Sequence, residues 1–142
     1  NDIIGYERQL GNPPNAPQTV SLAPSDKATI VMFDGNSIRF RKSLGTLSAS
    51  TPPVCQTFVN LNIIALGGGS IEFEQPVCLR GLLWADGPII IAQNSSISGA
   101  VVSVGDYIDV KDSSSISFNR SVLQSLLLPG FTGSTLLSWQ EL

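Results

Sequence analysis

The chain has 142 residues, the usual length of one domain, and a formal net charge of −3. Only 13% of its residues are charged whereas 42% are hydrophobic, which excludes an intrinsically disordered chain. The acidic balance argues against nucleic-acid binding, and no run approaches the ~20 apolar residues of a membrane span.

Residues 1–27 are rich in Asn, Pro and Ser and predict an irregular N-terminal cap with one strand at Gln18–Leu22. The thirteen Gly, the nine Pro and the many β-branched residues of the chain predict an all-β fold. The chain starts at Asn1, so either the mature protein begins there or a preceding segment has been removed.

Residues 28–117 contain an internal repeat. Four segments align, and the last three are contiguous with a period of about 18–19 residues, the scale of one coil of a β-solenoid. A single coil cannot bury its apolar face, so coils stack and their like side chains form continuous ladders. The sequence therefore predicts a short, single-domain parallel β-solenoid (β-helix) of about four rungs with irregular caps at both ends. The segments are Thr29–Leu47, Asn62–Arg80, Gly81–Ser98 and Gly99–Ser117.

The aligned segments share columns of like residues. Ladder positions two residues apart point to the same face of a strand, and a glycine three residues before the strand predicts a corner with positive φ. The columns are Val31, Ile64, Leu83 and Val101; Gly35, Gly68, Gly87 and Gly105; Ile38, Ile71, Ile90 and Ile108; Phe40, Phe73, Ala92 and Val110; and Leu79, Ile97 and Ile116.

Charged residues lie between the ladder positions. Arg39 and Arg41 of the first segment are expected to face Glu72 and Glu74 of the second. Opposite charges on neighbouring strands contribute a few tenths to about 1 kcal/mol each and help to fix the register. The alternative is a charge cluster that binds a substrate.

Residues 48–61 interrupt the repeat and predict a loop that leaves the stack and returns. Cys55 lies in this loop and Cys78 at the far end of the next coil, and the chain has no other cysteine and no histidine. Because a structural zinc site usually takes four Cys or His ligands, the pair predicts a disulfide, with two free thiols as the alternative. A disulfide would contribute on the order of 3 kcal/mol and indicate an oxidising compartment.

Residues 118–142 predict the C-terminal cap, with a short helix at Ser121–Leu128 that ends before Pro129 and Gly130. Both caps are expected to cover the unpaired strands that a solenoid leaves at its ends.

One strand of the repeat is apolar on both faces, which predicts that its outer face is covered. The cover is either the chain's own ends, Leu126–Leu128 or residues 1–27, or a partner protein. Aromatic rings on such a surface also stack on sugars, the alternative being that Trp84 and Trp139 help to bury it. The candidate partner or ligand surface consists of Ile63, Leu82, Trp84 and Tyr107.

The sequence predicts no enzyme, no cofactor and no metal site. Without histidine, Ser–His and Cys–His mechanisms are excluded. Asp106, Asp109 and Asp112 are three residues apart, a spacing that alternates between the faces of a strand and does not converge on one ion. Gly67–Gly69 lacks the Lys and the helix of a phosphate loop and is expected at a corner of the coil.

The run Gly81–Leu123 is similar to the C-terminal part of PilX-like minor pilins and pilus-assembly proteins of Gram-negative bacteria. The shared features are GLLWADG at residues 81–87, the ISFN of residues 116–119, and an ending with Pro129-Gly130 and then Ser-Trp-Gln-Glu at residues 138–141. The resemblance covers about the C-terminal half of the chain.

The resemblance implies a non-catalytic structural component of a type IV pilus (a fimbrium) or a related surface filament. Its membrane anchor would be an apolar N-terminal helix, which these 142 residues do not contain. Its partners would be other pilin subunits or pilus assembly proteins, and its location would be extracytoplasmic, at the cell surface, pilus or periplasm of a Gram-negative bacterium. The alternative is a secreted or surface module that binds a glycan or another ligand in cell adhesion, with Trp84 or Tyr107 as the platform.

Overall fold

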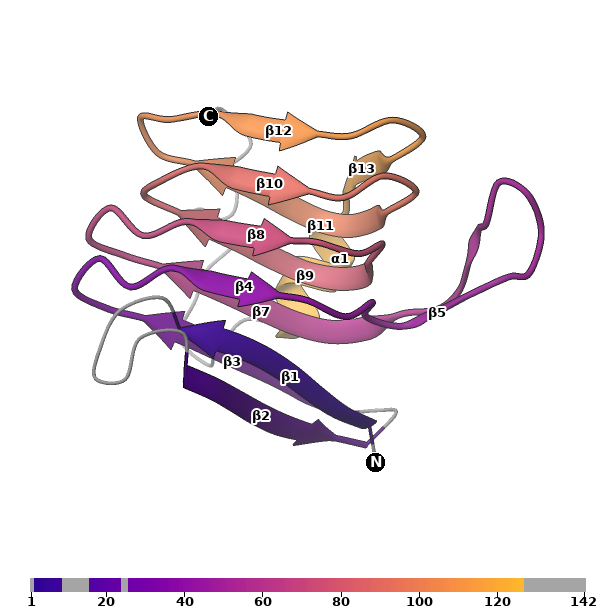
Figure 1. The fold of residues 1–142 in the computed structure, drawn as a ribbon, viewed down its shortest axis with the longest axis horizontal. Coiled ribbons are helices and arrows are strands. Elements are labelled where there is room, and N and C mark those ends of the chain that lie inside the picture. Colours follow the sequence, from indigo (N-terminus) through magenta and orange to yellow (C-terminus); the bar gives the residue numbers. More distant parts are fainter. Residues whose placement is uncertain (1, 9–15, 24–25, 127–142) are drawn as a thin grey trace.

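The computed structural model describes residues 2–8, 16–23 and 26–126 (Figure 1). In chain order the elements are β1 (Asp2–Arg8), β2 (Ala16–Leu22), β3 (Lys27–Met32), β4 (Ile38–Phe40), β5 (Thr46–Leu47), β6 (Cys55–Thr57), β7 (Val59–Ala65), β8 (Ile71–Phe73), β9 (Cys78–Ala85), β10 (Ile89–Ile91), β11 (Ser96–Ser103), β12 (Ile108–Val110), β13 (Ser115–Phe118) and α1 (Arg120–Leu126).

The strands of the repeat form two sheets that enclose one core. The first sheet has the order β12-β10-β8-β4-β1-β2 and the second the order β13-β11-β9-β7-β3. Each coil gives one strand to each sheet, so β3–β4, β7–β8, β9–β10 and β11–β12 form four stacked layers (Figure 1). Successive coils pair in parallel, which confirms the all-β, single-domain parallel β-solenoid predicted from the repeat.

The interior consists of ladders of like side chains, as the repeat predicts. Phe40 stacks on Phe73 with the ring centroids 5.1 Å apart. Leu79 pairs with Ile97 and Ile97 with Ile116, which confirms the last of the predicted columns.

Three of the predicted columns are out of register by one residue. The strand partner of Leu83 is Ile63 rather than Ile64, and the partner of Ile71 is Ile89 rather than Ile90. In the same way Ile91, and not Ala92, is the strand partner of Val110 in the next layer. Ile63, Ile89 and Ile91 are buried in the core, whereas Ile64 and Ile90 point outward and are half-buried.

The physical reason for the offset is a difference in turn length. From the second coil to the third, the pairing advances by 20 residues in one sheet, from Ile63 to Leu83, and by 18 in the other, from Ile71 to Ile89. The turn between β7 and β8 is longer than the turn between β9 and β10. The predicted columns advance by 19 residues in both sheets at this step. They are therefore one residue short in the sheet of β7 and β9 and one residue long in the sheet of β8 and β10.

The same offset divides the predicted glycine column. Gly35, Gly68 and Gly105 have φ values of 80°, 94° and 74°, as expected at corners. Gly87 is not among the glycines of positive φ, and its amide donates to the Gly69 carbonyl at 2.8 Å. It therefore stacks on Gly69 and not on Gly68.

Asn62 connects three coils through its side chain. Its Oδ1 accepts a hydrogen bond from the Leu82 amide of the next coil at 2.9 Å, and its Nδ2 donates to Thr29 Oγ1 of the previous coil at 3.2 Å. Next to this contact, a Cβ atom on Gly81 would lie 2.1 Å from the Leu61 carbonyl oxygen, so only glycine fits. The buried Asn62 side chain thus supplies a hydrogen bond where β7 and β9 have no backbone pairing.

The N-terminal cap is more regular than the sequence predicts. Instead of one strand in an irregular segment, β1 and β2 form an antiparallel hairpin, and β1 pairs with β4 through Glu7–Arg39 and Arg8–Ile38. The hairpin extends the first sheet beyond β4, with β2 as the outermost strand at that end (Figure 1). The alternation that identifies a half-buried strand is weak in β1, and the pairing with β4 is a long-range contact that the sequence does not reveal.

The predicted loop 48–61 is shorter than expected. Residues 59–61 already belong to β7, because Val59 pairs with Leu79 of the next coil. The rest leaves the stack as a small antiparallel hairpin of β5 and β6, visible at the side of Figure 1.

The C-terminal part of the described chain does not lie over the end of the stack. Phe118 still belongs to β13, and α1 packs against the side of β9 and β11. The helix begins close to the predicted position, at Arg120 rather than Ser121, and the predicted stop at Pro129 lies outside the described residues. In the described part of the chain, the last coil is therefore not capped.

Replacing Asn62 by Ala is expected to lower the free energy of unfolding by about 1–3 kcal/mol, because the buried Leu82 amide loses its acceptor. Asn60→Ala is the matched control, since Asn60 is half-buried on the same strand and its backbone pairs with Arg80. Urea unfolding followed by circular dichroism compares the two variants. Equal stability would contradict the role assigned to Asn62.

Candidate functional site

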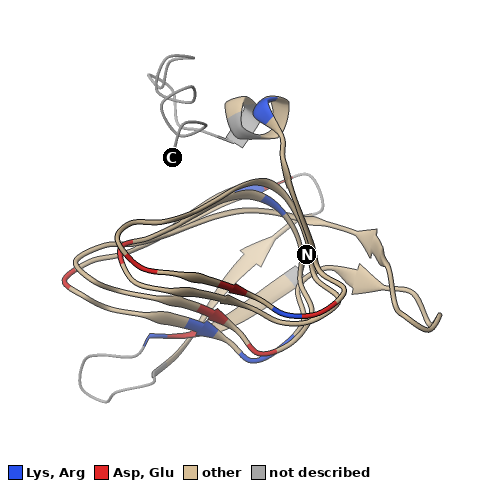
Figure 2. Cartoon of the chain, turned by 90° about the horizontal axis from the view of Figure 1, so that it is seen from above, with Lys and Arg blue, Asp and Glu red and all other residues tan. Residues whose placement is uncertain are grey.

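The outer face of the second sheet is covered by α1. The helix lies against β9 and β11 and reaches β7, and Figure 2 shows it beside the coils. Asn119 Oδ1 accepts a hydrogen bond from the Val122 amide at 3.1 Å and so caps the first turn of the helix. The chain's own C-terminal part thus supplies cover for this face; the predicted contribution of Leu127 and Leu128 lies outside the described residues.

The structure does not bring the four candidate surface residues together. Leu82 and Trp84 lie on the outer face beneath α1, where Leu82 is buried and Trp84 half-buried. Ile63 belongs to the interior, because the register offset places it opposite Leu83 and adjacent strand residues point to opposite faces. Ile63 is therefore not available to a partner. Tyr107 lies apart from the others, before β12 on the last coil, and 57% of it is exposed.

Cys55 and Cys78 form a disulfide, as the sequence predicts. Their Cα atoms are 5.7 Å apart, and the bond closes a loop of 23 residues. It attaches the hairpin of β5 and β6 to β9, where Cys78 is fully buried. The described residues contain no free cysteine.

A row of ion pairs follows the first sheet across three strands. Arg39 Nε lies 3.2 Å from Glu72 Oε1 and 3.5 Å from Glu74 Oε2, which confirms the predicted pairing of the first two coils. Arg41 contacts Glu74 at 3.4 Å and Glu7 of the N-terminal hairpin at 2.7 Å. Figure 2 shows acidic and basic positions close together on this side. The pairs join β1, β4 and β8 and favour one register of the stack.

The contact between Glu7 and Arg41 changes the pKa values of both side chains. The hydrogen bond from Arg41 lowers the pKa of the Glu7 carboxyl below its ordinary value of 4.5, and the positive charges of Arg41 and Arg39 act in the same direction. The same hydrogen bond raises the pKa of Arg41. Glu7 therefore stays ionised to lower pH in the folded chain than in the unfolded chain.

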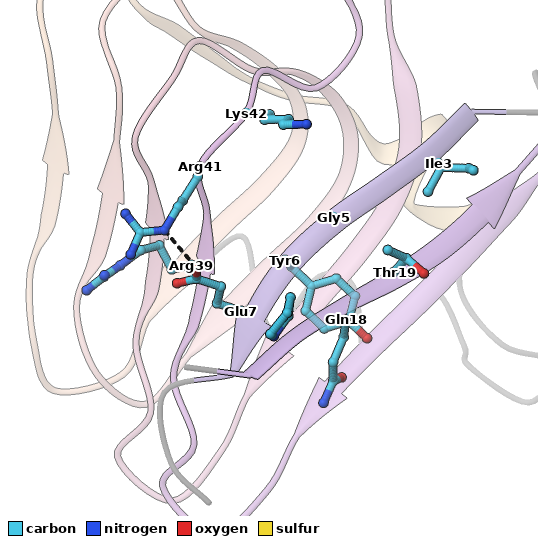
Figure 3. A pocket seen from close by; sticks show the side chains of 10 residues that line it. Ile3, Gly5, Tyr6, Glu7, Gln18, Thr19, Arg39, Arg41 and Lys42 are labelled. Atoms are coloured by element: carbon cyan, nitrogen blue, oxygen red, sulfur yellow. Dashed lines mark hydrogen bonds and ion pairs between the residues drawn. The ribbon is translucent and has the colours of Figure 1, made fainter. Parts of the chain in front are cut away.

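A recess of about 290 Å³ lies between the N-terminal hairpin and β4 (Figure 3). Tyr6 and Gln18 lie on one side of it, and Arg39 and Arg41 on the other. Both arginines are paired with glutamates, whereas Lys42, also at the recess, makes no ion pair with any residue that the structure describes. Burial raises the pKa of the Tyr6 hydroxyl. The side chains at the recess thus include a ring, an amide and an ammonium group.

The remaining residues considered in the sequence, Gly67–Gly69 and the aspartates near β12, lie in turns of the coils and on β12. Gly67–Gly69 lies in the turn between β7 and β8, and the Gly67 amide donates to Asp86 of the next coil at 2.6 Å. Asp109 pairs with Lys111 at 2.6 Å, and this hydrogen bond raises the pKa of Lys111. Asp106 accepts from the Tyr107 amide. Within residues 2–8, 16–23 and 26–126, no three His, Cys, Asp or Glu side chains cluster as metal ligands.

Comparison of the chain with protein-family models, with curated proteins and with solved structures finds no match. In the described part of the chain, no helix has the length and apolar character needed to cross a membrane.

The roles of Glu7 and Asn62 were not predicted from the sequence. Glu7 carries no local signal, since its role depends on the antiparallel pairing of β1 with β4. Asn62 does carry a local signal, because it is the one amide side chain in the otherwise apolar run Leu61–Ala65. When that run is buried, the amide needs a hydrogen-bond partner. The recess beside the N-terminal hairpin, and the exposure of the last coil among the described residues, also depend on long-range contacts.

Removing the disulfide with Cys55→Ala and Cys78→Ala is expected to lower the free energy of unfolding by about 2–4 kcal/mol, because the unfolded chain regains the freedom of the closed loop. Urea unfolding with and without reductant measures the effect. Reductant is expected to destabilise the native chain and to leave the double variant unchanged. A native chain that is insensitive to reductant would show that the bond contributes little.

Glu7→Gln is expected to destabilise the protein at neutral pH, and the difference from the native chain is expected to shrink in acid. The pKa of Glu7 is lowered on folding, so its contribution is present above the unfolded value and is lost as the pH falls through the folded value. Urea midpoints between about pH 7 and about pH 2 test this. Salt near 1 M, which screens exposed charges, serves as the control and should also reduce the difference. A difference that is independent of both pH and salt would contradict an electrostatic origin.

Proposed function

We propose that this chain is a non-catalytic structural component of a type IV pilus or a related surface filament, similar to a minor pilin. The observation that carries the proposal is the stack itself: four layers with continuous apolar ladders, a disulfide that ties the excursion of β5 and β6 to β9, and ion pairs that fix the register. Such an assembly acts through its shape and its resistance to unfolding rather than through a reacting group.

The use of the charged side chains supports this role. Along the first sheet, the two arginines pair with three glutamates instead of converging on a substrate; the residues are Arg39, Arg41, Glu7, Glu72 and Glu74. This arrangement favours the register role of these residues over the substrate-binding alternative.

An extracytoplasmic location is part of the proposal. Its support is the disulfide, since such bonds form and persist in oxidising compartments. The run that resembles PilX-like proteins, Gly81–Leu123, comprises β9 to β13 and the start of α1, which is two coils and the helix that covers their outer face.

The test is to locate the protein in its own cells. Filaments sheared from the cells are purified and analysed by mass spectrometry without reductant, beside the culture supernatant and the periplasm. We expect the chain in the filament fraction, with Cys55 and Cys78 linked, and its absence from filaments of a strain in which the major subunit is deleted. Recovery only as a free species would overturn the proposal.

A second candidate is a module that binds a glycan or another surface ligand, and the exposed ring of Tyr107 favours it. Aromatic rings that face solvent stack on the apolar faces of sugars. A glycan array probed with the native chain and with Tyr107→Ala separates the two functions. Binding that is lost in the variant supports the second candidate, and an array without signal removes it.

A further inference from the structure

The last coil of the solenoid exposes side chains that every earlier coil buries. Ile108 and Val110 of β12 are 38% and 42% exposed, although Ile89 and Ile91, one layer below in the same ladders, are fully buried. Ile116 of β13 is likewise 38% exposed above the buried Ile97. The ladders thus end on an apolar surface, which we call the open end and define by Tyr107, Ile108, Val110, Ile116 and Phe118.

The backbone of the open end is also available. Among the described residues, β12 and β13 are the outermost strands of their two sheets at this end of the stack. α1 does not lie across them, because it packs beside β9 and β11 (Figure 2). An edge strand with apolar side chains and unpaired amides and carbonyls accepts another strand by β-augmentation.

The opposite end of the stack is built differently. There β1 pairs with β4 and β2 follows β1, so the hairpin occupies the place that another coil would take in the first sheet. A second copy of the chain therefore cannot continue both sheets by stacking its N-terminal end on the open end.

The charge near β12 distinguishes between the molecules that could bind the open end: a second copy of the chain, the chain's own C-terminal residues or a strand of another protein. Within residues 104–112, Asp109 is paired with Lys111 at 2.6 Å, so Asp106 and Asp112, one on each side of β12, give the segment an excess of negative charge. Two copies that met through antiparallel β12 strands would bring two segments of the same negative sign together, which is unfavourable. Residues 127–142 contain no Lys or Arg and include Glu141, so the chain's own C-terminal residues offer no complementary charge.

The pairing of β4 with β8 shows which kind of sequence pairs with a strand like β12. In the lowest layers, Ile38-Arg39-Phe40 of β4 pairs with Ile71-Glu72-Phe73 of β8, with the apolar residues in the ladders and the arginine on the glutamate. β12 has the same pattern as β8, since Ile108 and Val110 flank the outward-facing carboxylate of Asp109.

We propose that the open end binds an extended basic strand of another protein, in which apolar residues alternate with Lys or Arg. The strand pairs with β12 as the next layer of the first sheet and covers Ile108 and Val110. It places a cation at Asp109, whose carboxylate it shares with Lys111. This partner deepens the proposed structural role and rests on it, because the strand would belong to a neighbouring component of the same assembly.

The test uses two peptides copied from the chain as probes. Residues 36–43 (NSIRFRKS) provide the basic strand, and residues 69–76 (GSIEFEQP) provide a matched control with the same Ser-Ile-x-Phe pattern and acidic residues in place of the arginines. Fluorescence anisotropy with the native 142-residue chain is expected to show at least about tenfold tighter binding of the basic peptide, and the difference should fall as salt is added. Hydrogen exchange is expected to show new protection at β12.

Two variants test the contacts separately. Asp109→Lys is expected to remove or reverse the preference for the basic peptide, and Ile108→Asp to abolish binding of both peptides. Both positions are at the surface, and circular dichroism together with the urea midpoint verifies that each variant folds. Glu72→Gln, which changes an ion pair in the lower layers, is the control and should leave peptide binding unchanged.

Several results would overturn the inference. Equal binding of the two peptides, or protection elsewhere than β12, would remove the basic strand as the occupant. Amides of β12 already protected in the free chain would show that the chain covers its own end, and a concentration-dependent dimer in light scattering would assign the surface to a second copy. None of these results bears on recovery of the chain in filaments, so failure of this inference and failure of the proposed function remain distinguishable.

Discussion

The structure depends on the requirement that each coil lay its apolar side chains on those of the coil below, at the spacing of about 4.8 Å between paired strands. Phe40 on Phe73 and Ile71 beneath Ile89 show this contact in the first sheet. The strands of a layer cannot slip without moving every side chain to the opposite face, so variation in chain length is confined to the turns. That is why the pairing advances by 20 residues in one sheet and 18 in the other while both ladders remain continuous.

The polar residues support the same requirement. Asn62 supplies a hydrogen bond where the backbones of β7 and β9 do not pair, and the row of ion pairs from Glu7 to Glu74 aligns three strands of the first sheet. The disulfide attaches the hairpin of β5 and β6 to β9, so the longest excursion from the stack remains tied to it. Asn62, the five charged residues of this row and the two cysteines thereby help to hold the register and the excursion from the stack.

The two ends of the stack differ in a way that suits a component of a larger assembly. The hairpin of β1 and β2 extends the first sheet with antiparallel strands and prevents a further parallel coil from following β4 there. The other end stops at β12 and β13 with its ladder residues partly exposed in the described chain. The two ends of the stack therefore offer different surfaces to a neighbouring molecule.

The sequence by itself determined the fold class, the number of layers, the disulfide and the pairing of Arg39 with Glu72, because stacked coils repeat like residues at nearly constant spacing and that repetition is visible along the chain. It did not determine the register within each sheet. The turn between β7 and β8 is two residues longer than the turn between β9 and β10, and an alignment of fixed period does not detect this difference. The resulting offset placed Ile63 on the surface in the prediction, whereas it lies in the core. Only the tertiary structure decided that β1 pairs with β4, that α1 covers the side of the stack and not its end, and that the last coil is open in the described chain. These are contacts between segments far apart in sequence. Local patterns of apolar and polar residues do not predict which distant strand edge or sheet face a segment packs against.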